Sequence, residues 1–249
     1  MSLELLQIKA LNFFSQLVEN QRTYLAVLLV FSLIIKSYLI YHAEIINPDG
    51  IRYINSANEL LQGNIASAFS HEKMLGYTFL LGLTHLVFPE WFLAGKVLSC
   101  VALVMTTIPL YLIARELFGG RAAFFASLIF TVVPTVNGRA VSVIKDPSFL
   151  FLILLALWFV IYALKESSWR LSLVAGFLSC LSVLIRPEGV VFFAAVALFL
   201  LASIVFLPKS RIMSLQHLAS FCFIPFGTLL LAMLSFATGV ISPEVLPGI

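Results

Sequence analysis

Charged residues are scarce in this chain of 249 residues: Asp, Glu, Lys and Arg together make up 11% of it, and 61% is hydrophobic. Soluble domains carry about 25% charged residues. Apolar runs of roughly 15 to 25 residues recur along the whole length, and a helix of about 20 residues crosses the hydrocarbon core of a bilayer. The sequence therefore predicts an all-α polytopic membrane protein, organised as one membrane domain over residues 1–249.

Runs of basic residues and patterned cysteines are also lacking. The formal net charge is only +3 and the basic residues are scattered, which excludes nucleic acid as a partner. Cys100, Cys180 and Cys222 each lie inside an apolar run, with neither a disulfide pattern nor metal-ligand spacing. Membrane lipids remain as the expected surroundings of the chain.

Seven membrane spans are predicted from the apolar runs. They cover about 24–42, 92–114, 122–136, 147–164, 171–185, 188–207 and 215–238. Residues 1–23 form an amphipathic lead-in, expected on the inner membrane face. A large loop, 43–91, separates the first two spans. In it, residues from Ile51 to Gly63 show the pattern of an interfacial helix, and the apolar run 74–88 is too short to cross, so a re-entrant or half-buried helix is expected there.

The distribution of Lys and Arg among the loops orients the chain. With the amino terminus inside, the inner loops hold Lys9, Arg22, Arg115, Arg121, Lys165, Arg170, Lys209 and Arg211. Lys36, near the outer end of the first span, is expected to extend to the interface. This orientation requires that 74–88 does not cross, because a crossing would place Asp146 on the opposite side from Asp49.

Four loops then bring ionisable residues together on the outer face. They contribute Asp49 with Arg52, His71-Glu72-Lys73, Arg139 with Lys145-Asp146, and Arg186 with Glu188. Charged groups at the edge of a bilayer are costly to hold there and mark a functional site by default. Mixed carboxylates and cations suit a transfer reaction in which a carboxylate takes a proton from an acceptor hydroxyl and cations hold a departing phosphate.

At these residues the sequence resembles the GT-C superfamily of polyprenyl-phosphate-sugar-dependent glycosyltransferases, near the protein O-mannosyltransferases and the aminoarabinose transferases of lipid A. Asp49, Arg52-Tyr53 and a helix ending at Gly63 match its first-loop pattern. Glu72-Lys73 matches its Glu-Lys-Pro-Pro stretch, although Met74-Leu75 replaces the prolines. The inner element from Ala114 to Arg121, then Asp146, then Arg186-Pro187-Glu188-Gly189, follow in the family's order.

The resemblance implies a module of seven membrane helices and an inverting transferase at the outer face of a bacterial or archaeal membrane. It implies Asp49 as the general base, with Lys73 and Arg186 holding the phosphate of a polyprenyl-phosphate-sugar donor. Asp146 and Glu72 would position the substrates or a divalent cation, the one cofactor considered. The remaining candidate binding residues are Arg52, Tyr53, Arg139, Lys145 and Glu188, and His71 is a secondary metal candidate. The acceptor is a hydroxyl of a protein, lipid or glycan.

Plainer roles stay open for the same residues. Asp49 can cap a helix that begins near Ile51, and Asp146 can cap the span that begins at Pro147. Lys73 and Arg186 can anchor helix ends at the interface.

Two rival functions also stay open. Family members usually continue with further spans, whereas this sequence stops at Ile249, so one alternative is a non-catalytic module that binds a lipid carrier or a partner subunit. A transporter is a weaker alternative, because no inverted repeat is visible.

Overall fold

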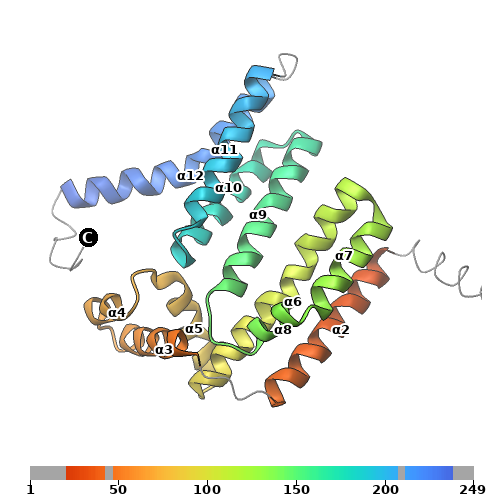
Figure 1. Ribbon diagram of the computed structural model, residues 1–249. Helices are drawn as coiled ribbons and strands as arrows, with labels where there is room; N and C mark the ends of the chain where they lie inside the picture. Colours follow the sequence, from red (N-terminus) through yellow and green to blue (C-terminus); the bar gives the residue numbers. More distant parts are fainter. Residues whose placement is uncertain (1–20, 43–46, 207–210, 238–249) are drawn as a thin grey trace, which may run out of the picture.

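The computed structural model describes residues 21–42, 47–206 and 211–237, and over these ranges the chain forms eleven helices and no strand (Figure 1). The predicted all-α fold is therefore confirmed, while the predicted lead-in lies almost entirely outside the described residues. The helices are α2 Gln21–His42, α3 Pro48–Leu61, α4 Ile65–His71, α5 Leu75–Val87, α6 Trp91–Phe118, α7 Gly120–Val132, α8 Pro134–Ala140, α9 Asp146–Glu166, α10 Trp169–Ile185, α11 Gly189–Phe206 and α12 Arg211–Ala237.

Four of the described helices are long and apolar enough to cross a membrane, namely α2 from Thr23 onward, α6, α9 and α11. The α7–α8 pair gives a fifth span if its two bent halves are taken together. The apolar helix α10 has 17 residues and is about 26 Å long at 1.5 Å per residue, slightly less than the hydrocarbon core of about 30 Å. The chain is thus a polytopic helical membrane protein, and the count of seven spans stays a prediction.

The third predicted span, 122–136, is not one straight helix. Helix α7 ends at Val132, Val133 is extended (φ −60°, ψ 125°), and α8 starts at Pro134 with its axis bent by 59°. A residue that precedes proline is driven out of the helical region by the proline ring, which explains the break at Val133. The bend turns α8 across the end of the bundle and carries Arg139 with it.

Helices α3, α4 and α5 gather at one end of the bundle, beside α8 and the start of α9 (Figure 1). Helix α5 has 13 residues and is about 20 Å long, too short for the hydrocarbon core. One of its faces is exposed and apolar, with Phe79, Leu83, Leu86 and Val87, while Tyr77 and Leu81 on the other are fully buried. An exposed apolar face suits contact with lipid, so α5 fits a helix that enters the bilayer without crossing it.

The segment between α8 and α9 is fixed to the helices around it. Val143 is 1% exposed and packs where two helix glycines leave space: a Cβ on Gly50 or Gly95 would lie 2.9 Å or 2.5 Å from its side chain. The Ser99 hydroxyl on α6 donates a hydrogen bond to the Ser142 carbonyl oxygen at 2.7 Å. This packing holds the segment that leads into α9 against α6 and the start of α3.

Lys36 does not extend to the interface, and that prediction is wrong. Its side chain is 0% exposed and its Nζ donates a hydrogen bond to Ser32 Oγ at 2.9 Å, one helical turn back. The two residues share the face of α2 that packs on α6 and α7, so the direction of the ammonium is set by neighbouring helices. A hydropathy pattern within α2 carries no information on which face those helices cover.

Candidate functional site

A cavity of about 500 Å³ lies between the start of α3, helix α8 and the segment that leads into α9. Its lining residues are Asn47, Asp49, Tyr53, Thr135, Gly138, Arg139, Ser142, Ile144, Lys145 and Asp146. Five of them belong to the predicted site, and they come from stretches nearly a hundred residues apart in the sequence. The structure thus brings Asp49 and Asp146 to the same cavity, as expected if α5 does not cross the membrane.

Asp49 lies in the first turn of α3, with its side chain 52% exposed. It does not cap the helix: the cap is Asn47, whose Oδ1 accepts a hydrogen bond from the Asp49 backbone N–H at 3.1 Å, and Pro48 occupies the first helical position. An acidic residue in the first turn is favoured by the helix dipole. Arg52, one turn later, donates to Asp49 Oδ1 at 2.7 Å, and Asp49 lines the cavity.

Asp146 stands between two arginines. Arg139 from α8 bonds one carboxylate oxygen, and Arg186 from the end of α10 bonds the other. Arg186 also holds Glu188 through two contacts, of 2.9 Å and 3.3 Å, and its guanidinium lies 5.7 Å from the centre of the Phe149 ring. Asp146 is the first residue of α9 and not its cap, which is Lys145. These four charged residues, Arg139, Asp146, Arg186 and Glu188, form the arginine–carboxylate cluster.

A second ion pair ties the loop after α4 to the segment before α9. Lys145 Nζ lies 3.3 Å from Glu72 Oε1, and the two side chains are only 18% and 11% exposed. Lys145 Nζ also lies 5.5 Å from the centre of the Tyr53 ring, which meets Tyr77 edge to face at 5.1 Å. Burial, together with the nearby Glu72 and Asp49 carboxylates, raises the pKa of Tyr53 to about 12. Its hydroxyl is therefore neutral at physiological pH.

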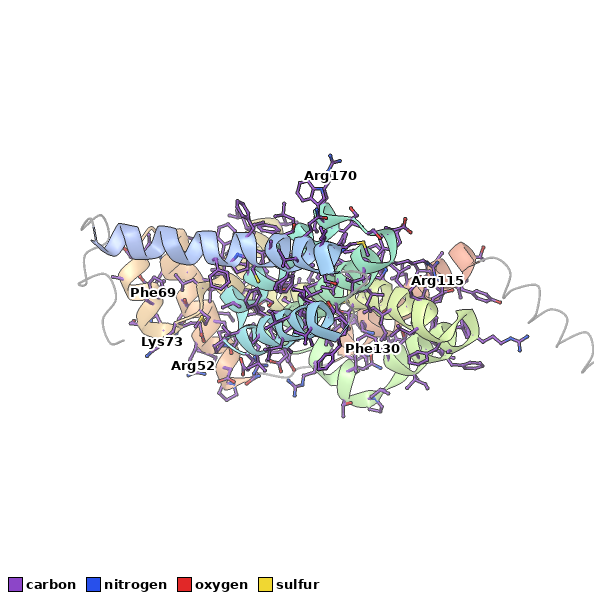
Figure 2. All side chains as sticks on the ribbon, turned by 90° about the horizontal axis from the view of Figure 1, so that it is seen from above. Arg52, Phe69, Lys73, Arg115, Phe130 and Arg170 are labelled. Carbon is purple, nitrogen blue, oxygen red and sulfur yellow. The ribbon has the colours of Figure 1, made fainter. Side chains whose placement is uncertain are left out.

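Lys73 and His71 are not among the residues that line the 500 Å³ cavity. Both are exposed, and Figure 2 shows Lys73 near Arg52 and Phe69 at one end of the molecule, with Arg115 at the other. No three His, Cys, Asp or Glu side chains converge on a metal-binding arrangement within the described ranges. Both carboxylate oxygens of Asp146 instead bond guanidinium groups.

Two further cavities adjoin the arginine–carboxylate cluster. One, of about 400 Å³, lies between α6, α8 and α9; Arg139, Asp146 and Arg186 line it together with Leu103, Leu150 and other apolar residues. The other, of about 550 Å³, is almost wholly apolar and lies between α5, α6, α9 and α10. Its lining includes Ser148 and Ile185, close in sequence to Asp146 and Arg186.

Sequence reasoning missed two residues that shape the site, Asn47 and Ser99. The signal for Asn47 was present, because Asn followed by Pro is the pattern of a helix cap with proline in the first position. Ser99 had no local signal, since its partner lies 43 residues away.

A family model described as dolichyl-phosphate-mannose-protein mannosyltransferase matches residues 72–238, well over half of the chain. The chain belongs to this mannosyltransferase family. Its members are membrane glycosyltransferases of the GT-C type, so the resemblance inferred from the motifs is confirmed. The match includes Glu72, the arginine–carboxylate cluster and Lys145, while Asp49 lies before its first residue. A comparison of this chain with curated proteins found no match.

Proposed function

We propose that this chain transfers a sugar from a polyprenyl-phosphate donor to an acceptor hydroxyl at the outer face of a bacterial or archaeal membrane, with inversion at the sugar carbon. The supporting observation is that a half-exposed carboxylate, Asp49, lines the same cavity as Arg139 and Asp146, and that Asp146 also bonds Arg186, which lines the adjoining 400 Å³ cavity. The family's description names a dolichyl-phosphate-mannose donor, which has this chemistry.

The proposed reaction assigns one role to each charged group. The acceptor oxygen attacks the anomeric carbon as its proton passes to Asp49, and the bond from that carbon to the phosphate oxygen breaks on the opposite face. The phosphate leaves with the bonding electrons and is held by Arg186, with Arg139 and Lys73 adding positive charge. Arg52 orients Asp49 through their 2.7 Å contact, and Glu72 fixes Lys145 beside Tyr53.

The apolar cavity between α5, α6, α9 and α10 suits the hydrocarbon part of such a donor. Its lining is almost free of polar surface, and it includes Ile185, which is next in sequence to Arg186 of the arginine–carboxylate cluster. A lipid phosphate can therefore place its headgroup at the arginines while its isoprenoid chain stays among apolar side chains. A free nucleotide sugar would gain nothing from this cavity.

The test uses the purified chain in lipid nanodiscs, with mannosyl polyprenyl phosphate as donor and a membrane extract as the source of acceptors. Release of polyprenyl phosphate is the readout. The Asp49→Asn variant is expected to lose a factor of about 10² to 10⁴ in turnover, the usual contribution of general base catalysis. Glu59→Gln, on the same helix, is the matched control and should stay near the wild-type rate.

Full activity in Asp49→Asn would remove Asp49 from the role of base. Donor binding without turnover by the wild-type chain, in the presence of acceptors, would instead support a non-catalytic module that holds the lipid carrier.

A further inference from the structure

Both oxygens of Asp146 are occupied by guanidinium groups from different parts of the chain. Arg139 arrives on α8 and Arg186 on the link between α10 and α11, and they bond opposite oxygens of the same carboxylate. The guanidinium group of arginine matches the oxygen atoms of both carboxylate and phosphate groups, so two arginines that converge on one point can hold either anion. An internal carboxylate therefore fills the place where two arginines would hold an external anion.

The charges of the cluster are balanced in this state. Arg139 and Arg186 supply two positive charges, and Asp146 and Glu188 supply two negative ones. The nearby pairs Arg52 with Asp49 and Lys145 with Glu72 are neutral as well. An entering phosphate gains little from arginines that are already neutralised by carboxylates, unless one of those carboxylates moves away.

Asp146 has the position from which such a move is feasible. Its side chain is 32% exposed and borders both the 500 Å³ and the 400 Å³ cavities. It is also the first residue of α9, where free backbone N–H groups and the helix dipole stabilise a negative charge that has left its arginines. Glu188 is more exposed, at 54%, and forms its ion pair with Arg186.

We propose that Asp146 is an internal substitute for the donor phosphate. In the ligand-free chain it keeps Arg139 and Arg186 in place, and it releases both arginines to the phosphate when the donor binds. The released carboxylate then faces the cavity that it shares with Asp49, where it accepts a hydrogen bond from a sugar or acceptor hydroxyl. After transfer, Asp146 returns to the arginines and displaces the product phosphate. This inference rests on the proposed function, because it takes a lipid phosphate as the ligand.

Equilibrium binding of geranylgeranyl phosphate to the chain in nanodiscs tests the proposal, with chelator present throughout. Removal of a competing internal anion is expected to tighten binding, so Asp146→Asn should bind about tenfold more tightly than the wild type while its turnover falls. Glu188→Gln should gain much less, because Glu188 engages only one of the two arginines. Arg186→Gln should bind more weakly. If Asp146→Asn does not fold, Asp146→Ser, which removes the same charge, takes its place in the test.

Weaker or unchanged binding by the Asp146 variants would overturn the proposal. A direct ligand role or a role through a divalent cation predicts weaker binding, and the reverse order of the Asp146 and Glu188 variants would also contradict it. The outcome is separate from that of the proposed function. If Asp146→Asn binds more tightly but the wild type is inactive, the exchange of Asp146 for phosphate is supported and the transferase function is refuted. If the wild type is active but Asp146→Asn binds more weakly, the transferase function is supported and the exchange is refuted.

Discussion

Glu72 and Lys145, 73 residues apart in the sequence, form an ion pair of 3.3 Å that joins the loop after α4 to the start of α9. Both side chains are mostly buried, so neither charge has much water as an alternative partner. The pair therefore connects the loop between α4 and α5 to the part of the chain that carries Asp146.

The first prediction concerns this ion pair. Either Glu72→Gln or Lys145→Met alone leaves one largely buried charge without its partner and should lower the free energy of unfolding by about 1–3 kcal/mol. The double variant should recover part of that loss, because no unpaired charge remains. Thermal unfolding of the four proteins in one detergent gives the coupling energy. Additive losses in the double variant would show that the two charges do not interact.

Glu188 provides a prediction on pH. Its hydrogen bonds with Arg186 hold the pKa of the Glu188 carboxyl below its ordinary value of 4.5. A lowered pKa in the folded state means that the pair stabilises the protein fully above pH 4.5 and that this contribution is lost as the pH falls through the folded-state pKa. The difference in melting temperature between wild type and Glu188→Gln should thus be constant from pH 7 to about 5.5 and shrink in more acidic buffer. A difference that grows on acidification would contradict this account.

A third prediction addresses the contact of α5 with α10. A Cβ at Gly76 would lie 2.6 Å from the carbonyl oxygen of Leu184, which is backbone and cannot turn aside. Gly76→Ala should therefore cost about 1–3 kcal/mol, the usual penalty of overpacking, and push α5 away from the end of α10 near Arg186. Gly120→Ala, with no atom within 4 Å of its new Cβ, is the control. Equal melting temperatures for the two variants would mean that α5 does not approach α10 this closely.

For Lys36 we predict a substitution that stabilises the protein. Its buried ammonium bonds Ser32 and has no ion pair among the described residues. A buried charge without a counter-ion is costly, so Lys36→Met should raise the free energy of unfolding by about 1–3 kcal/mol. Ser32→Ala should lower it in the wild type and have little effect in the Lys36→Met background. A destabilised Lys36→Met protein would show that the ammonium has a favourable partner.

The last prediction tests sidedness. In a variant that lacks Cys100, Cys180 and Cys222, single cysteines at Gln62 and Gly138 should react with an impermeant maleimide from outside intact cells. A cysteine at Glu166 should react only after permeabilisation. Gln62 precedes α5 and Gly138 follows it, so opposite labelling of these two positions would mean that α5 crosses the membrane.

Local patterns in the sequence were enough to locate the apolar helices and the four loops of the site. The apolar runs gave α2, α6, α9 and α11, because a span must be apolar over its whole length whatever surrounds it. The turn sequence before α3 was located too. Asp49 was considered as a possible cap of this helix, but the cap is Asn47, followed by Pro48 in the first helical position. The error came from weighing Asp alone, without the preference of proline for the first helical position.

Contacts between distant residues were beyond the sequence. The clustering of outer charges was inferred from topology, yet nothing in the sequence indicated that Arg139 and Arg186 would share Asp146 rather than pair with separate carboxylates. The burial of Lys36 likewise depends on which face of α2 the neighbouring helices cover. Such contacts arise from the packing of helices that are distant in the sequence, and a single sequence does not show which helices pack together.

The packing of Val143 against Gly50 and Gly95 has a consequence for how this site varies during evolution. Three positions from separate parts of the chain share one volume, since a Cβ at either glycine would enter the space of the valine side chain. Residues that share a volume are coupled in their effects. Positions 50, 95 and 143 are therefore expected to co-vary, with a larger residue at either glycine accepted only alongside a smaller one at 143.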